Sequence, residues 1–207
     1  MKTPDLLPLL VALLAGAPVA ATAETWRGEI VPLNQERTAQ SPSGTVTLSR
    51  GDGQLTIELT AEGLSPGVHL AHLHGFEGAD PAEARCPGAD ADSNGDGVVD
   101  LIETREAAGV TMIPLTADPA SLAIQADTYP EANGDGAMEY RQTVDLAALE
   151  EALRDKFDAP PALERRVLFI HGVTEQVDVP DSAQSLEGVP ARVTLPIACA
   201  ELEPAEQ

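Results

Sequence analysis

The strongest constraint on the fold is a pair of neighbouring stretches in which apolar and polar residues alternate with a period of two. In the second stretch, Leu55, Ile57 and Leu59 share one face while threonine and glutamate take the other, as in a strand with one buried side. Residues 44–50 alternate in the same way. The sequence Arg50-Gly51-Asp52-Gly53 between the two is a tight hairpin signal, so we expect an antiparallel pair.

Other short apolar runs, separated by Gly, Pro and Ser, extend this pattern along the chain. They cover residues 25–33, 109–116, 121–126, 165–172 and 191–202. One segment, residues 144–157, instead repeats leucine at three and four, with Asp145 as a start cap and Pro160-Pro161 beyond its end. Many short strands with one late helix predict an all-β sandwich or barrel that carries long loops.

The first 23 residues have the make-up of a secretory signal peptide. Leu6–Ala20 is apolar and uncharged, and Ala21-Thr22-Ala23 is a small-x-small cleavage signal. A membrane anchor is the alternative, but the run is short for a bilayer and is broken by two prolines. We therefore expect a mature domain of residues 24–207 that is periplasmic or secreted, with no membrane span after cleavage.

The net charge limits the kinds of partner that the chain can bind. A formal net charge of −22 repels nucleic acid and anionic lipid and attracts cations.

The two cysteines, Cys86 and Cys199, are an even pair, which in an exported protein indicates a disulfide first. Such a bridge would close a loop of more than about 100 residues and stabilise the fold by several kcal/mol. Two free thiols are the alternative.

Three of the four histidines lie between Gly67 and Gly75. His72 and His74 are two residues apart, so on a strand both rings point to the same side. His171 ends a separate apolar run, and if the two strands are neighbours, three imidazoles converge. That donor set suits copper or zinc and leaves a coordination position open. His69 faces the other way on a regular strand and is expected to be structural. The alternative is that all four are ordinary strand histidines that bind no metal.

The acidic stretch of residues 92–103 fits the twelve-residue calcium loop D-x-[DN]-x-[DN]-G-x5-E without a mismatch. Its expected oxygen ligands are Asp92, Asn94, Asp96, the carbonyl of Val98, Asp100 and Glu103. A solvated acidic loop is the alternative. A second Asn-Gly-Asp-Gly, residues 133–136, has no acidic residue at the closing position and is expected to be a turn.

The histidine stretch resembles the copper-ligand strand of the Cu/Zn superoxide dismutase family, G-[LV]-H-x-x-H-x-H-x-F-G. The positions matched are Gly67, His69, His72, His74 and Phe76. The resemblance continues at the "LFIHG" of His171, which matches the last copper histidine, and at the "IACAEL" of Cys199, whose family partner corresponds to Cys86. It implies a Greek-key β-barrel or sandwich of that type, a copper site of His72, His74 and His171, and superoxide as a substrate.

Several departures put the family's activity in doubt. Between Cys86 and Ile170 the sequence contains no histidine, so the family's bridging and zinc histidines have no counterpart. The family's guiding arginine is replaced by Pro196, and Arg192 lies further upstream. The resemblance also suggests that the inserted loop, about residues 86–108, binds calcium where the family uses zinc.

Three functional hypotheses follow. The leading one is an exported, superoxide dismutase-like copper-binding protein that disproportionates superoxide to oxygen and hydrogen peroxide. The second keeps the site but makes the protein a non-catalytic copper carrier or buffer. The third is a calcium-stabilised extracytoplasmic binding module whose histidines only pack or hydrogen-bond.

Overall fold

The alternating hairpin lies at the centre of one sheet. The computed structural model describes residues 23–205, so the predicted signal peptide lies almost wholly outside the described residues. Strand β3 (Ser43–Gly51) pairs with β4 (Gln54–Glu62) along its whole length. The turn residues Asp52 and Gly53 have φ angles of 51° and 74°, the left-handed region that a two-residue hairpin loop requires. As predicted, the leucines and isoleucine of β4 are buried and its threonines and glutamate point outward.

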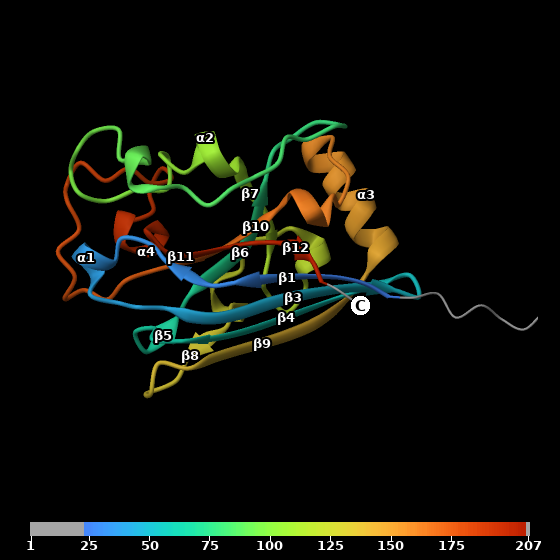
Figure 1. Cartoon of the computed structure of the whole chain (residues 1–207), viewed down its shortest axis with the longest axis horizontal. Coiled ribbons are helices and arrows are strands. Elements are labelled where there is room, and N and C mark those ends of the chain that lie inside the picture. The colour runs from blue at the N-terminus through green and yellow to red at the C-terminus, as the bar shows by residue number, and fades with distance from the viewer. Residues whose placement is uncertain (1–22, 206–207) are drawn as a thin grey trace, which may run out of the picture.

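Two antiparallel sheets of five strands each form the sandwich (Figure 1). In spatial order, the first sheet contains β12 (Glu203–Pro204), β1 (Glu24–Glu29), β3, β4 and β9 (Met138–Asp145). The second contains β2 (Val31–Pro32), β11 (Pro196–Glu201), β10 (Val167–His171), β6 (Leu70–Gly75) and β7 (Val110–Pro114). A separate pair joins β5 (Gly67–Val68) to β8 (Glu131–Ala132).

The chain crosses repeatedly between the two sheets. After β4 it passes to β6 and β7 in the second sheet, returns to place β9 beside β4, and crosses again to place β10 beside β6. This return of a later strand to the side of an earlier one is the Greek-key pattern. The predicted all-β Greek-key sandwich with long loops is thus confirmed.

The core between the sheets is aliphatic. Val46, Leu48, Leu73, Leu168 and Ile170 are each fully buried there. Because successive strand residues point to opposite faces, burial of Leu73 and Ile170 in the core directs their neighbours on β6 and β10 to the outer face of the second sheet. That outer face carries the histidines.

The helices are short except for one. They are α1 (Gln35–Thr38), α2 (Arg105–Ala108), α3 (Leu146–Phe157) and α4 (Ala191–Thr194), with 3-10 turns at Ala89–Ala91, Pro119–Ser121, Ala126–Thr128 and Leu163–Arg165. The predicted late helix is α3, which starts as expected with Asp145 accepting the Ala148 N–H at 2.8 Å. Figure 1 shows α3 at the opposite end of the molecule from α1 and α4.

Two local expectations are wrong, and one strand was not predicted. The apolar run of residues 121–126 is not a strand but irregular chain flanked by 3-10 turns. The expected last strand, residues 191–202, begins instead as α4 and becomes extended only at Pro196. Strand β9 was not expected, since Gln142 interrupts the alternation of apolar residues on its inner side.

A second, smaller hydrophobic cluster lies outside the sandwich. It contains Ala84, Ala108, Val167, Phe169 and Cys199. The predicted Cys86–Cys199 disulfide is formed across it and ties the long loop after β6 to β11. The alternative of free thiols is therefore wrong. Within residues 23–205, no helix is long and apolar enough to cross a membrane.

Candidate metal centre

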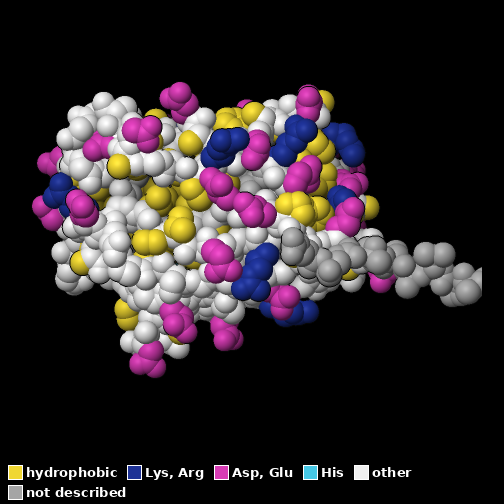
Figure 2. Space-filling view, viewed as in Figure 1, with side chains coloured by type: hydrophobic (Ala, Val, Ile, Leu, Met, Phe, Trp, Pro, Cys, Tyr) yellow, Lys and Arg dark blue, Asp and Glu magenta, His cyan; other side chains and the backbone are white. Residues whose placement is uncertain are grey.

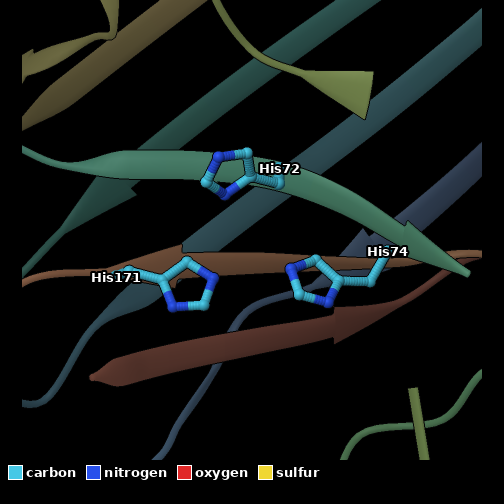
Figure 3. A group of neighbouring side chains, drawn as sticks. All are labelled: His72, His74 and His171. Atoms are coloured by element: carbon cyan, nitrogen blue, oxygen red, sulfur yellow. The ribbon is translucent and has the colours of Figure 1, made fainter. Parts of the chain in front are cut away.

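Strand pairing brings the three predicted histidines together. On β6, His72 lies opposite Phe169 and His74 opposite Val167 of β10. His171, two residues beyond Phe169, therefore projects from the same face of the sheet. Figure 3 shows the two rings of β6 and the ring from β10 turned toward one another.

One ring nitrogen from each histidine lies within 4.8 Å of the other two. The ring centroids of His72, His74 and His171 are 5.4–6.0 Å apart. His72 Nδ1, His74 Nδ1 and His171 Nε2 are buried and have no hydrogen-bond partner among the described residues. Buried polar atoms are nearly always satisfied, so a group of three buried rings, each with an unpartnered nitrogen, indicates a site for a cation.

Each ring also has one nitrogen at hydrogen-bond distance from an oxygen. His171 Nδ1 donates to the carbonyl of Thr194 at 2.8 Å. The Nε2 atom of His74 lies 3.0 Å from Thr111 Oγ1, and that of His72 lies 2.5 Å from Tyr129 Oη. Metal-binding histidines usually have such an oxygen partner, which sets the ring orientation and the tautomer. Neighbouring oxygens therefore help to fix the orientation of all three rings.

Burial keeps these imidazoles neutral. The three side chains are 1–4% exposed, and on the face drawn in Figure 2 no histidine of the described residues reaches the surface. Desolvation lowers the pKa of His72 and of His74 well below the usual value, and the nearby His171 lowers both further. Desolvation also lowers the pKa of His171 to about 4, although its bond to Thr194 acts in the opposite direction. Neutral imidazole is the form that binds metal.

His69 does not join the group. Its Nδ1 lies 3.1 Å from the carbonyl oxygen of His171, and its Nε2 lies 2.8 Å from that of Ser65. Both nitrogens are turned to backbone carbonyls, so neither faces the other three rings. The ring links the start of β6 to the end of β10.

The predicted calcium residues lie along one loop that is exposed at Asn94 and buried at Val98 and Asp100, and its own side chains fold it. Asp92 accepts the N–H groups of Gly95, Asp96 and Gly97, and Gly97 has the left-handed φ of 88° that the sharp turn needs. Glu103 reaches back to accept the N–H of Ser93 at 2.8 Å. Glu103 therefore joins the two ends of the loop.

The loop carboxylates nevertheless point to separate partners. Asp96 accepts from Ser182 and Asp100 accepts from the N–H of Gln184, both on the segment after β10. In the described part of the chain, the only group of three or more His, Cys, Asp or Glu side chains gathered within 4.8 Å is the histidine group. The structure thus brings together the predicted copper residues and not the predicted calcium residues. The side chain of Asn94 accepts the N–H of Asp96 at 2.9 Å, and the N–H of Val98 donates to Asp96 at 3.1 Å, both within the loop.

Three supporting residues were not found from the sequence. Thr111 lies beside His74 on β7, and Thr194 contacts His171 only because α4 turns back over the sheet. Tyr129 belongs to an irregular segment 57 residues from His72 along the chain. Nothing in its sequence neighbourhood signals that contact, which depends wholly on tertiary structure.

Comparison with known proteins gives a weak structural similarity and no match in sequence. No model of a protein family matches this chain, and neither does any curated protein. Among solved structures it is similar to the Cu/Zn superoxide dismutase from Brucella abortus, with 20% identity over 87% of this chain and 100% of that chain and a TM-score of 0.39. A match this weak says nothing about chemistry, so the nature of the site rests on its own geometry.

Proposed function

We propose that this protein binds a copper ion through one ring nitrogen each of His72, His74 and His171, with Nδ1 of His72 and Nε2 of His171 facing the ion. The observation that supports it is that three buried imidazoles each bring one nitrogen within 4.8 Å of the other two. The far nitrogens of His72 and His171 lie at hydrogen-bond distance from Tyr129 Oη and the carbonyl of Thr194, so these two rings need little reorganisation on binding.

Copper is favoured over other divalent metals by the donor set. Imidazole nitrogen is a good ligand for copper and zinc, whereas calcium and magnesium prefer oxygen. For a given nitrogen site, Cu²⁺ binds more tightly than Zn²⁺. Bound copper would supply one-electron redox chemistry.

The role that the burial of the site supports best is to hold copper. All three ligand side chains and Tyr129 are at most 5% exposed, so an external molecule has little access to the metal position. A net charge of −22 also repels anions such as superoxide. We therefore favour a copper carrier or buffer.

Dismutation of superoxide is the second candidate. Three histidines leave a coordination position open, which is the observation in its favour. The reaction converts two superoxide anions and two protons to oxygen and hydrogen peroxide. Between Cys86 and Ile170 the chain offers no histidine, so protons would have to come from water.

The test is copper content and affinity. We expect the purified protein to retain one copper per chain after dialysis, measured by metal analysis. His171→Gln should weaken binding at least about 100-fold, because one of three ligands is lost, and competition with a chelator of known affinity measures this.

His69→Gln is the matched control. It makes the same change at an equally buried histidine that lies outside the group. The copper stoichiometry of this variant should be unchanged. Thermal unfolding measures the effect of the substitution on stability. Wild-type protein without copper, or equal affinity in His171→Gln, would overturn the proposal. The rate of superoxide decay with loaded protein then separates the two roles, and decay no faster than with the metal-free protein supports the carrier.

We also propose that residues 92–103 bind calcium, with Asp92, Asn94, Asp96, Val98, Asp100 and Glu103 as ligands, and that calcium stabilises the inserted loop. The supporting observation is that Glu103, the closing residue of the pattern, accepts the N–H groups of Ser93 and Asp100 and so joins the two ends of the loop. Its carboxylates would exchange their bonds to Ser182 and Gln184 for the ion.

Export is the third part of the proposal. A disulfide across the second hydrophobic cluster suits an oxidising compartment, and the first 23 residues have the composition of a signal peptide. Residues 24–207 would then be a single periplasmic or secreted domain.

A further inference from the structure

Tyr129 lies directly against the candidate copper site. Its hydroxyl is 2.5 Å from His72 Nε2, and the two rings meet edge to face with centroids 5.1 Å apart. The side chain is 5% exposed. The contact is on the side of the His72 ring away from the metal-facing Nδ1, so Tyr129 touches a ligand without being one.

The backbone around Tyr129 is fixed to the strand that carries His72. The carbonyl of Pro130, the next residue, accepts the N–H of His69 at 3.1 Å. Strand β8 begins one residue later and pairs with β5, which leads into β6. Main-chain hydrogen bonds at Pro130 and β8 therefore fix the position of Tyr129 relative to His72.

The state of the His72 ring in a metal complex follows from simple chemistry. When Nδ1 binds a cation, it carries no proton, so Nε2 must carry one. A buried N–H needs an acceptor, and the phenolic oxygen of Tyr129 lies at hydrogen-bond distance from it. The corresponding acceptor for His171 is the backbone carbonyl of Thr194.

We propose that Tyr129 is a positioning residue of the copper site: its hydroxyl accepts the Nε2 proton of His72 and holds Nδ1 toward the metal, and its ring covers the site against external anions. This inference rests on the proposed copper function. It adds a residue for which neither the histidine motif nor the resemblance supplies a role.

Two substitutions separate the two parts of the proposal. Tyr129→Phe removes the hydroxyl and keeps the covering ring, and it should weaken copper binding about 10- to 100-fold and change the hyperfine pattern of the Cu(II) electron paramagnetic resonance spectrum. Tyr129→Ala removes both groups. It should in addition let azide, a small anionic ligand of Cu(II), bind at least tenfold faster, as followed by its charge-transfer absorption.

Tyr140→Phe is the matched control. Tyr140 donates to the carbonyl of Thr116 and so holds the beginning of the segment that carries Tyr129, without a bond to any histidine. The affinity of the Tyr140→Phe variant for copper should stay within about twofold of the wild type, and its Cu(II) electron paramagnetic resonance spectrum should be unchanged. Thermal unfolding of all three variants checks that each is folded.

The outcomes distinguish this inference from the copper proposal. If the wild-type protein binds no copper, both are wrong. If it binds copper and Tyr129→Phe matches Tyr140→Phe in affinity and spectrum, the positioning role is wrong while the copper site stands. If azide enters Tyr129→Ala no faster than the wild type, the covering role is wrong.

Discussion

At the residue scale, His171 is the histidine whose proton position is decided most completely by its surroundings. Its Nδ1 faces the carbonyl of Thr194, which can only accept, so the proton lies on Nδ1 and the lone pair of Nε2 faces His72 and His74. Its ring is also buried, which disfavours a second proton. A neutral imidazole aimed at its neighbours is therefore the stable form even without a metal.

This has a consequence for the stability of the metal-free protein. The pKa of His171 is lowered to about 4 in the folded state, against about 6.5 in an unfolded chain. Between these values the unfolded state binds a proton that the folded state does not, so stability falls as the pH drops from about 6.5 to about 4. Above that window the histidine has no effect on the pH dependence.

The expected slope from this residue is up to about 1.4 kcal/mol per pH unit. Denaturant unfolding of metal-free wild type and His171→Gln between pH 4 and 8 measures it. The difference in unfolding free energy between the two proteins should be constant above about pH 6.5. Between about pH 6.5 and 4 the wild type should lose stability relative to His171→Gln. Parallel curves over the whole range would show that His171 is not buried in its neutral form.

At the element scale, the acidic loop depends on its neighbours for its place. The side chain of Asn34 holds both the N–H and the carbonyl of Val99, and it also donates to the carbonyl of Pro196 at the start of β11. On its other side the loop contacts the segment after β10 through Asp96 and Asp100. The loop is thus fixed to two elements that lead to the histidine sheet.

Calcium is expected to add to this stabilisation. Removing it with a chelator should lower Tm, because the carboxylates of the loop then repel one another without a cation between them. Asp96→Ala should remove most of the chelator effect. Asp135→Ala makes the same change in the second Asn-Gly-Asp-Gly sequence, which lacks the closing glutamate. This variant should show the same chelator effect on Tm as the wild type. Equal melting curves with and without chelator for the wild type would contradict the calcium proposal.

At the scale of the whole molecule, the disulfide joins the inserted loop to the sandwich. Cys86 and Cys199 are 113 residues apart, and they lie in the small cluster of Phe169 and Val167 on the outer face of the second sheet. This cluster is next to the histidines, since the ring of Phe169 is 4.6 Å from that of His74. The bridge therefore limits opening of the loop at the side where the candidate site lies.

Loss of the bridge should destabilise the fold strongly. A loop of this length is worth about 4–5 kcal/mol in the chain-entropy model, and measured losses are about 2–5 kcal/mol. Denaturant unfolding of the Cys86→Ala, Cys199→Ala double variant against the oxidised protein measures the change. A loss below about 1 kcal/mol would mean that the loop is held by its hydrogen bonds and packing alone.

Local patterns were sufficient for much of this structure. The hairpin at Asp52-Gly53 and the buried face of β4 depend on turn preference and on the period of a strand, which act over a few residues. The cap of α3 by Asp145 is equally local. Strand β9 and helix α4 were missed because their conformations depend on the sheet edge and loop that they contact.

The sequence by itself determined that His72 and His74 point to one side, because residues two apart on a strand share a face. It also determined which face of each alternating strand is buried. Only the tertiary structure decided that β10 lies beside β6 and so brings His171 to them, and only it brought Tyr129 to His72. These contacts join segments far apart in the chain, and their formation depends on how the two sheets and the loops pack together rather than on any local preference.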